Sequence, residues 1–153
     1  MESLTLGTEV ICQIGFVVRD VAKTARDYQE ILGLPAPRMA ETASADETSI
    51  RYCGQATEAR AKLAFFQMGE QLSLELIEPI GGPSTWREFL DAHGEGVHHI
   101  AFRIKGTDEK LAVLESKGLT TVQTGEYTGG RYAYVDAMDK LKVCLELLEK
   151  LPT

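Results

Sequence analysis

Histidine and cysteine are scarce in this chain of 153 residues, which contains three of each. Cys12, Cys53 and Cys144 are odd in number and far apart, and they form no C-x-x-C pair. Their spacing therefore argues against a zinc or redox site built on cysteine. We interpret them as reduced thiols packed as small hydrophobic residues.

Long apolar runs and an excess of basic residues are also missing. No apolar stretch reaches the roughly 18–20 residues that cross a bilayer, and MESLTLGTE lacks a basic segment followed by an apolar one. The 16 Lys and Arg against 23 Asp and Glu give a formal net charge of −7. That sign is wrong for a polyphosphate partner. We therefore expect a cytoplasmic protein with neither a nucleic-acid nor a membrane partner.

The first half of the chain is predicted to be one strand, one helix and three further strands. The β-branched and aromatic run VICQIGFVVRD predicts the first strand. Apolar residues spaced by three and four predict a helix from Val21, capped by Asp20 and ended by Gly33. Residues 36–47 lack periodicity and are predicted to be loop. Three strand-like runs follow: TSIRYCG, KLAFFQMG and LSLELIEP.

The same order returns after a linker. Gly and Pro in PIGGPSTW mark a break, and STWREFLDAHG predicts a short helix capped by Ser84 or Thr85 and ended by Gly94. Beyond it, VHHIAFRIKG predicts a strand and TDEKLAVLESKG a helix capped by Thr107. The last three runs are predicted to be strands: TTVQTGEYTG, RYAYVDAMD and KVCLELLEK.

This repeat predicts the fold. QIGFVVRD aligns with HIAFRIKG, and LELIEP aligns with LELLEK at the far end of each half. Two βαβββ modules of this size would each expose an apolar sheet face, so they should join. We expect an α+β fold in which both modules form a curved mixed sheet around a central cleft. The expected single domain, 1–153, comprises a first module at about 8–80, a linker helix at about 81–94 and a second module at about 95–150.

Side chains with ligand chemistry stand at matched positions of the repeat. Gln13 and His99 lie in the first strands of the two halves, and Glu75 and Glu146 lie between leucines in the last strands. An acid in an apolar strand is expensive to bury unless it is paired or bound to a cation. We therefore predict that these four residues hold one divalent cation. Two carboxylates, an imidazole and an amide oxygen suit a six-coordinate ion, which leaves Zn, Ni, Co, Mn and Mg admissible.

Each residue taken alone has another interpretation. Gln13 can be an ordinary polar strand residue, and His99 can be a hydrogen-bonded core histidine. His98 should face the opposite side of a regular strand. The acids Glu78 and Glu149 lie near strand ends, where we expect them to be solvated.

The chain resembles the vicinal oxygen chelate superfamily, the glyoxalase, bleomycin-resistance and dioxygenase fold. The resemblance covers about residues 10–149 and is carried by QIGFVVRD, DYQEILG, LELIEP, GEGVHHIAFRI and LELLE. GEGVHHIAF, LELIEP and the helix between them are similar to methylmalonyl-CoA epimerase. The resemblance maps metal ligands onto the same four positions, although epimerases usually carry histidine where this chain has Gln13. Glutamine there, with the other three ligands, is similar to some glyoxalase I enzymes.

The resemblance implies a metal-dependent epimerase or isomerase, or a lyase, that abstracts a proton next to a carbonyl or thioester. Glu146 would act as a base, and Glu58 occupies the place of an epimerase acid that serves as a second base. The expected substrate is a small acyl-CoA or a thiol adduct, and the expected assembly is a homodimer. Two alternatives stay open: a glyoxalase I-like lactoylglutathione lyase, and a binding protein of the bleomycin-resistance type without catalytic activity.

Overall fold

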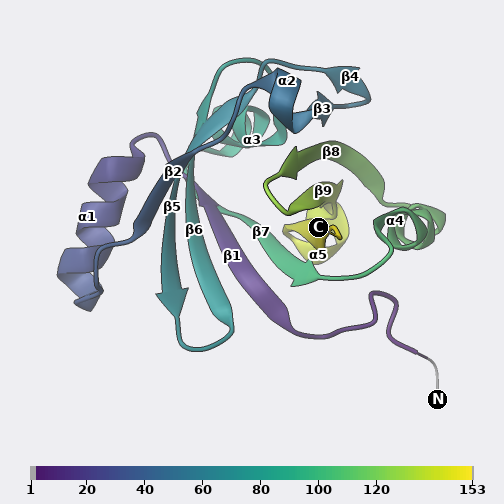
Figure 1. The fold of residues 1–153 in the computed structure, drawn as a ribbon, viewed down its shortest axis with the longest axis horizontal. Helices are drawn as coiled ribbons and strands as arrows, with labels where there is room; N and C mark the ends of the chain where they lie inside the picture. The colour runs from purple at the N-terminus through teal and green to yellow at the C-terminus, as the bar shows by residue number, and fades with distance from the viewer. Residues whose placement is uncertain (1–2, 153) are drawn as a thin grey trace.

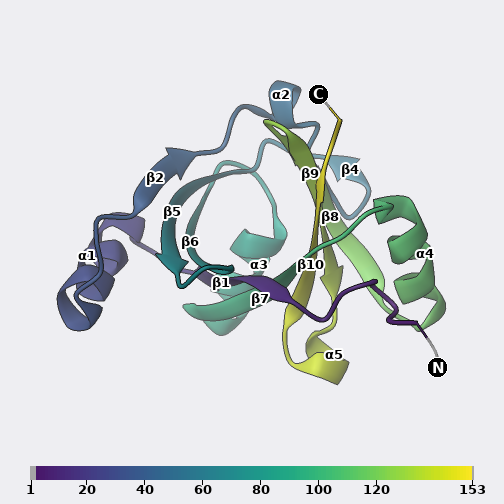
Figure 2. The ribbon, with the colours of Figure 1, turned by 60° about the horizontal axis from the view of Figure 1, so that its bottom comes forward.

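The computed structural model describes residues 3–152, and within them ten strands form one mixed sheet. The strand order is β2-β5-β6-β1-β7-β10-β9-β8-β3-β4. The sheet curls strongly, so that β5 and β6 face β8 and β9 from opposite sides of the curl (Figures 1 and 2). None of the helices in the described part of the chain is long and apolar enough to cross a membrane. The predicted α+β fold with a curved mixed sheet is confirmed.

The elements follow the predicted repeat with one exception. The predicted strand TSIRYCG forms only the two-residue β3, which pairs with β8 of the second half, and β2 stands next to β5 in its place. The first half contains β1 (Ile11–Val17), α1 (Val21–Leu32), β2 (Arg38–Glu41), α2 (Ala45–Thr48), β3 (Arg51–Tyr52), β4 (Gln55–Ala56), β5 (Arg60–Met68) and β6 (Leu72–Ile80). The second half contains α3 (Thr85–His93), β7 (Gly96–Arg103), α4 (Thr107–Ser116), β8 (Thr120–Tyr127), β9 (Gly130–Asp136), α5 (Met138–Leu141) and β10 (Cys144–Lys150).

The segment 36–47 is not entirely loop, contrary to the prediction. Its residues 38–41 form β2, which pairs antiparallel with β5 at the edge of the sheet, and its end enters the short helix α2. An edge strand is held by backbone hydrogen bonds and needs no apolar alternation on its own side chains. The burial pattern of β2 is accordingly almost entirely exposed, which explains why its sequence carried no strand signal.

The cysteines are free, and they occupy different environments. Cys144 is buried and Cys12 is half-buried, in keeping with the interpretation as packed thiols. Cys53 is exposed, so the interpretation was wrong for this residue. It lies in the turn between β3 and β4 with a φ of 51°, where the backbone turns away from the core.

The two halves join through their first strands. β1 pairs antiparallel with β7, and each of these strands pairs in parallel with the last strand of its own half, β6 and β10 respectively. Gly15 stands opposite Glu75 on one side and opposite His99 on the other. Glu146 stands opposite Ala101, two residues beyond His99. This register brings the matched positions of the repeat to the middle of the sheet.

Helix α3 lies inside the curl of the sheet (Figure 2). Trp86 and Leu90 are buried in a core cluster with Val17, Ile77 and Tyr134, which come from both halves. Burying a side chain of the size of leucine stabilises the fold by about 1.5–3 kcal/mol. The predicted Ser84 cap is confirmed, because the Ser84 hydroxyl accepts a hydrogen bond from the backbone of Arg87. Helices α1 and α4 pack outside the curl.

The acids near the strand ends, Glu78 and Glu149, are bound rather than solvated, which corrects the prediction. Glu78 accepts a hydrogen bond from the backbone N–H of Val21 at 2.9 Å, at the start of α1. Glu149 accepts from the backbone N–H groups of Gly106 and Thr107 at 2.8 and 3.1 Å, at the start of α4. The cap position of α4 is Gly106 and not the predicted Thr107, which is the first residue of the helix. The Thr107 hydroxyl donates to Glu149 at 2.6 Å. Carboxylates suit helix N-termini, where unpaired N–H groups point outward.

Replacing Glu149 with glutamine tests this arrangement. The hydrogen bonds from Thr107 and Gly106 lower the pKa of Glu149 from its ordinary 4.5 to about 2. A lowered folded-state pKa adds stability above pH 4.5 that is lost as the pH falls toward 2. We expect Glu149→Gln to lower the free energy of unfolding at pH 7 by about 1 kcal/mol, since solvent screens part of the interaction. Urea unfolding should show this difference shrinking with acid, whereas the exposed neighbour Lys150→Gln should show none.

Candidate metal centre

The four predicted ligand residues meet at the centre of the sheet. Their side chains come from neighbouring strands: Gln13 from β1, Glu75 from β6, His99 from β7 and Glu146 from β10. His99 Nε2 lies 3.1 Å from Gln13 Oε1, 3.2 Å from Glu146 Oε1 and 3.5 Å from Glu75 Oε1. One potential ligand atom from each of Glu75, His99 and Glu146 lies within 4.8 Å of the others. This is the spacing that a single ion needs.

The group is almost sealed from solvent. His99 is fully buried, Glu146 is 4% exposed and Glu75 is 7% exposed. Burial raises the pKa of Glu75 well above its usual range, and the nearby Glu146 charge raises it further. Burial also raises the pKa of Glu146 to about 8, against a smaller opposing effect of a hydrogen bond from Tyr134. Burial lowers the pKa of His99 to about 3.

These shifts describe a donor set that lacks positive charge. Two acids that resist ionisation lie beside an imidazole that resists protonation, so none of the three can neutralise another. A divalent cation would supply the missing positive charge, because it would favour both carboxylates as anions and the imidazole as a neutral ligand. The Gln13 amide can interact with the group with or without an ion. Turned one way its oxygen faces the group, and turned the other way its nitrogen donates to Glu146 at 3.0 Å. The donor set therefore fits a divalent ion.

Gly15 provides the space for the His99 ring, a role that the sequence analysis missed. A Cβ built on Gly15 would collide with Cε1, Nδ1 and Nε2 of His99. The strand therefore needs the absence of a side chain rather than a special backbone conformation. A glycine inside a strand is a signal of such close approach, and QIGF carries it.

His98 shares the buried side with His99, which corrects the expectation that it faces the other way. The register between β1 and β7 shifts here, because Gly15 stands opposite His99 while Phe16 stands opposite Val97. His98 is thus the extra residue of a β-bulge, and a bulge breaks the regular alternation of side chains. Its Nδ1 lies 3.0 Å from Nδ1 of His99. A regular strand pattern gives no sign of such a bulge.

Glu58 lies apart from the group. It is exposed and precedes β5, whose first residue Arg60 stands opposite Ile80 at the end of β6. The residue of β5 that stands opposite Glu75 is Phe65, in the second half of the strand. The extended conformation of β5 therefore separates Glu58 from Glu75.

A cavity of about 350 Å³ lies at the edge of the sheet near Glu75, between β2, β5, β6 and the loop that follows α1. Phe65 stands opposite Glu75 and Ser73 precedes it by two residues, so both share its face. The Arg38 guanidinium lies 4.2 Å from the centre of the Phe65 ring. Its positive charge lowers the pKa of Glu75, against the larger opposite effects of burial and Glu146. The cavity is lined by Leu34, Pro35, Ala36, Arg38, Phe65, Phe66, Gln67 and Ser73.

Comparison with known proteins places this geometry in context. The uncharacterized protein YqjC of Bacillus subtilis strain 168 is 28% identical over 139 residues, which cover 89% of each chain. A crystal structure of methylmalonyl-CoA epimerase from Mycobacterium tuberculosis is 22% identical, with a TM-score of 0.67 over 99% of this chain and 93% of that one. A methylmalonyl-CoA epimerase in complex with methylmalonyl-CoA and NH4+ is 23% identical, with a TM-score of 0.62 over 92% of this chain and 93% of that one.

At these identities the two solved structures show that the fold is shared. The sequence model of the glyoxalase/bleomycin resistance protein/dioxygenase superfamily matches residues 12–135, which include three of the four residues of the central group. The resemblance drawn from the sequence motifs is therefore confirmed. The chain belongs to the glyoxalase/bleomycin resistance protein/dioxygenase superfamily.

Proposed function

We propose that this protein is a metal-dependent isomerase or epimerase that removes a proton next to a carbonyl or thioester. The observation that carries the proposal is the buried convergence of Glu75, His99 and Glu146, with Gln13 beside them. Two adjacent buried carboxyl groups cost stability without a cation, so a purely structural role for them is unfavourable. The same four residues would hold the ion. A binding protein without catalytic activity has no need for this donor set.

A bound divalent cation would supply a Lewis acid that polarises a carbonyl oxygen and makes the adjacent C–H more acidic. The protein itself supplies the bases. In the metal-free group burial raises the pKa of Glu146 to about 8, so a Glu146 carboxylate that leaves the ion is basic enough to accept a carbon-bound proton near neutral pH. Burial also excludes water, which strengthens every electrostatic interaction within the group.

Epimerisation needs proton transfer on both faces of the substrate carbon. Glu75 and Glu146 come from β6 and β10, which flank the central pair β1 and β7 on opposite sides. We assign one face to each carboxylate: Glu146 accepts the proton of the substrate carbon, and Glu75, when it is released from the ion and protonated, returns one from the other side. Glu58, which the epimerase resemblance suggested for the second role, is exposed outside this arrangement.

The proposed substrate class is an acyl-CoA thioester. Two observations support it: the similarity in fold to methylmalonyl-CoA epimerases, one of them in complex with methylmalonyl-CoA, and the cavity beside Glu75. Phe65, which stands opposite Glu75, offers apolar contact for an acyl group, and Arg38 offers a positive charge for an anionic one.

A glyoxalase I-like reaction is the second candidate, and Gln13 favours it. An amide oxygen in place of the histidine of typical epimerases, together with two glutamates and one histidine, matches the ligand chemistry described above for some glyoxalase I enzymes. That reaction also moves a proton next to a carbonyl, so the same two carboxylates would serve it.

Metal analysis tests the site directly. Purified protein reconstituted with Zn²⁺, Co²⁺, Ni²⁺ or Mn²⁺ should retain one ion per chain, measured by elemental analysis after desalting. Glu75→Ala and His99→Ala should retain little of it, because each removes a ligand and leaves an unpaired carboxyl group. His93→Ala is the matched control, since His93 is exposed at the end of α3. Equal metal retention in all variants would contradict the proposed centre.

The space at Gly15 gives a second test. We expect Gly15→Ala to bind the ion at least about tenfold more weakly, because the added methyl group displaces the His99 ring from its position. Overpacking at this point should also lower the free energy of unfolding by about 1–3 kcal/mol. Isothermal titration with Co²⁺ and urea unfolding measure the two effects. Unchanged Co²⁺ affinity would show that the ring position does not matter for binding.

Solvent exchange tests the reaction. Wild-type protein in D2O should incorporate deuterium at the α-carbon of methylmalonyl-CoA, as measured by NMR, and Glu146→Gln should lower that rate at least about 100-fold. Glu58→Gln should exchange at the wild-type rate, since Glu58 is exposed outside the group.

The same assay with the hemithioacetal of methylglyoxal and glutathione separates the two candidates. Exchange only with the thioester supports the epimerase, and turnover only of the hemithioacetal supports the lyase. An unchanged exchange rate in Glu146→Gln would remove Glu146 from the mechanism.

A further inference from the structure

A hydrogen-bonded chain leads from the buried group to helix α3. His99 directs Nε2 at Gln13, Glu75 and Glu146, and its Nδ1 lies 3.0 Å from Nδ1 of His98. The Nε2 of His98 lies 3.1 Å from the hydroxyl oxygen of Thr85, the first residue of α3. Both nitrogens of each imidazole therefore have a partner.

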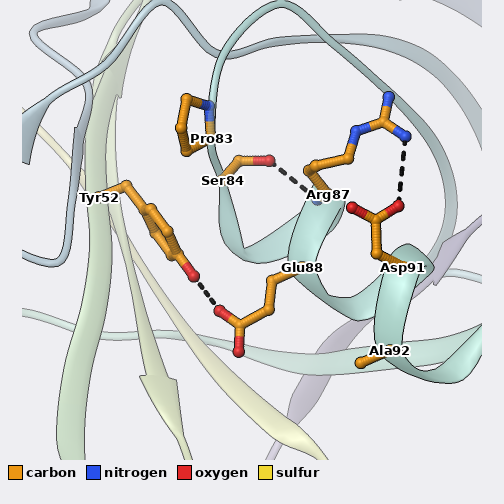
Figure 3. A pocket seen from close by; sticks show the side chains of 7 residues that line it. All are labelled: Tyr52, Pro83, Ser84, Arg87, Glu88, Asp91 and Ala92. Carbon is orange, nitrogen blue, oxygen red and sulfur yellow. Dashed lines mark hydrogen bonds and ion pairs between the residues drawn. The ribbon is translucent and has the colours of Figure 1, made fainter.

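The start of α3 is itself held firmly. The backbone N–H of Thr85 donates to Oε1 of the buried Gln123 at 2.8 Å. The Ser84 hydroxyl accepts from the backbone of Arg87, and the Tyr52 hydroxyl donates to Glu88 (Figure 3). These residues line a pocket of about 440 Å³ beside the start of α3. Thr85 is thus a fixed anchor rather than a mobile surface residue.

The His98 ring is also fixed in orientation. It is 1% exposed and packs edge to face with Phe89 and Tyr134, with ring centres 5.3 and 5.2 Å away. These contacts prevent the ring from turning over, so its Nδ1 stays directed at His99 and its Nε2 stays directed at Thr85. Packing alone would require only an apolar ring of this shape.

The chain of hydrogen bonds has two possible directions. In one, Thr85 donates to His98 and His98 donates to His99, which leaves the proton of His99 on Nε2, facing the carboxyl groups. In the other, His99 Nδ1 donates to His98 and His98 Nε2 donates to Thr85, which leaves a lone pair on His99 Nε2. Only the second direction lets His99 act as a ligand.

We propose that His98 and Thr85 are positioning residues that hold His99 in the tautomer whose Nε2 carries a free lone pair. The inference rests on the proposed metal-dependent function and extends it to residues outside the ligand set. The Thr85 hydroxyl oxygen accepts a hydrogen bond from Nε2–H of His98, and His98 Nδ1 accepts one from Nδ1–H of His99. Nε2 of His99 is then left free to coordinate. Partners of this kind typically change metal affinity by about 10–100-fold when they are removed.

A pair of substitutions at Thr85 separates positioning from packing. Thr85→Val keeps the volume but removes the hydroxyl, whereas Thr85→Ser keeps the hydroxyl. We expect Thr85→Val to bind Co²⁺ about tenfold more weakly than the wild type in isothermal titration, and Thr85→Ser to bind it as the wild type does. His98→Leu should weaken binding further, and His93→Ala should not. Circular dichroism and urea unfolding of each metal-free variant check the fold.

Histidine ¹⁵N spectra give a readout that a structural role would not change. In Zn²⁺-loaded wild-type protein, we expect protons on Nδ1 of His99 and on Nε2 of His98. In metal-free Thr85→Val, the proton of His98 should shift toward Nδ1 and the proton of His99 toward Nε2, because Nε2 of His98 then lacks an acceptor.

The outcomes distinguish this inference from the function on which it rests. Wild-type protein that binds none of the ions would overturn the metal-dependent function itself and the inference with it. Wild-type protein that binds Co²⁺, together with equal affinities for Thr85→Val and Thr85→Ser, would overturn only the positioning role. A proton on Nδ1 of His98 in the loaded protein would overturn it as well.

Discussion

The burial of two carboxyl groups beside an imidazole is the constraint on which the centre of this protein depends. Glu75 and Glu146 cannot both ionise in a sealed group without a compensating cation, and His99 is too deeply buried to provide one by protonation. The fold carries this cost because the three residues come from separate strands that backbone pairing holds together. A divalent cation held by these residues would lower this cost, because it would favour both carboxylates as anions.

The residues around the group hold the His99 ring in one orientation. Gly15 opens a space in β1 for His99, and the bulge in β7 places His98 against the same ring. Helix α3 packs on the inner side of the curl, and Thr85 at its first position reaches His98. Gly15 and the bulge both depart from a regular strand: Gly15 lacks a side chain, and the bulge adds a residue. Local irregularity in the strands is thus the means by which the centre is organised.

The repeated motif has divided its two acids between two roles. In LELIEP and LELLEK the first glutamate enters the central group, and the second binds the N-terminus of the helix in its own half. Glu75 and Glu146 point to one side of the sheet and Glu78 and Glu149 serve the helix that follows the first strand. The same short motif therefore fastens each module's helix and supplies the shared centre with a carboxylate.

The sequence by itself determined the α+β class, the duplicated order of elements and the four residues that converge, because alternation along strands and correspondence between repeats are local properties of the chain. It did not reveal β2, the caps formed by Glu78 and Glu149, or the placement of His98. Each of those depends on a partner distant in the chain: an edge strand on β5, a carboxylate on a remote helix, and a register shift between β1 and β7. Only the tertiary structure decided them, because each depends on hydrogen bonds to a partner distant in the chain and not on the local side-chain pattern. The bulge is an example, since hydrogen bonding between strands fixes where it occurs.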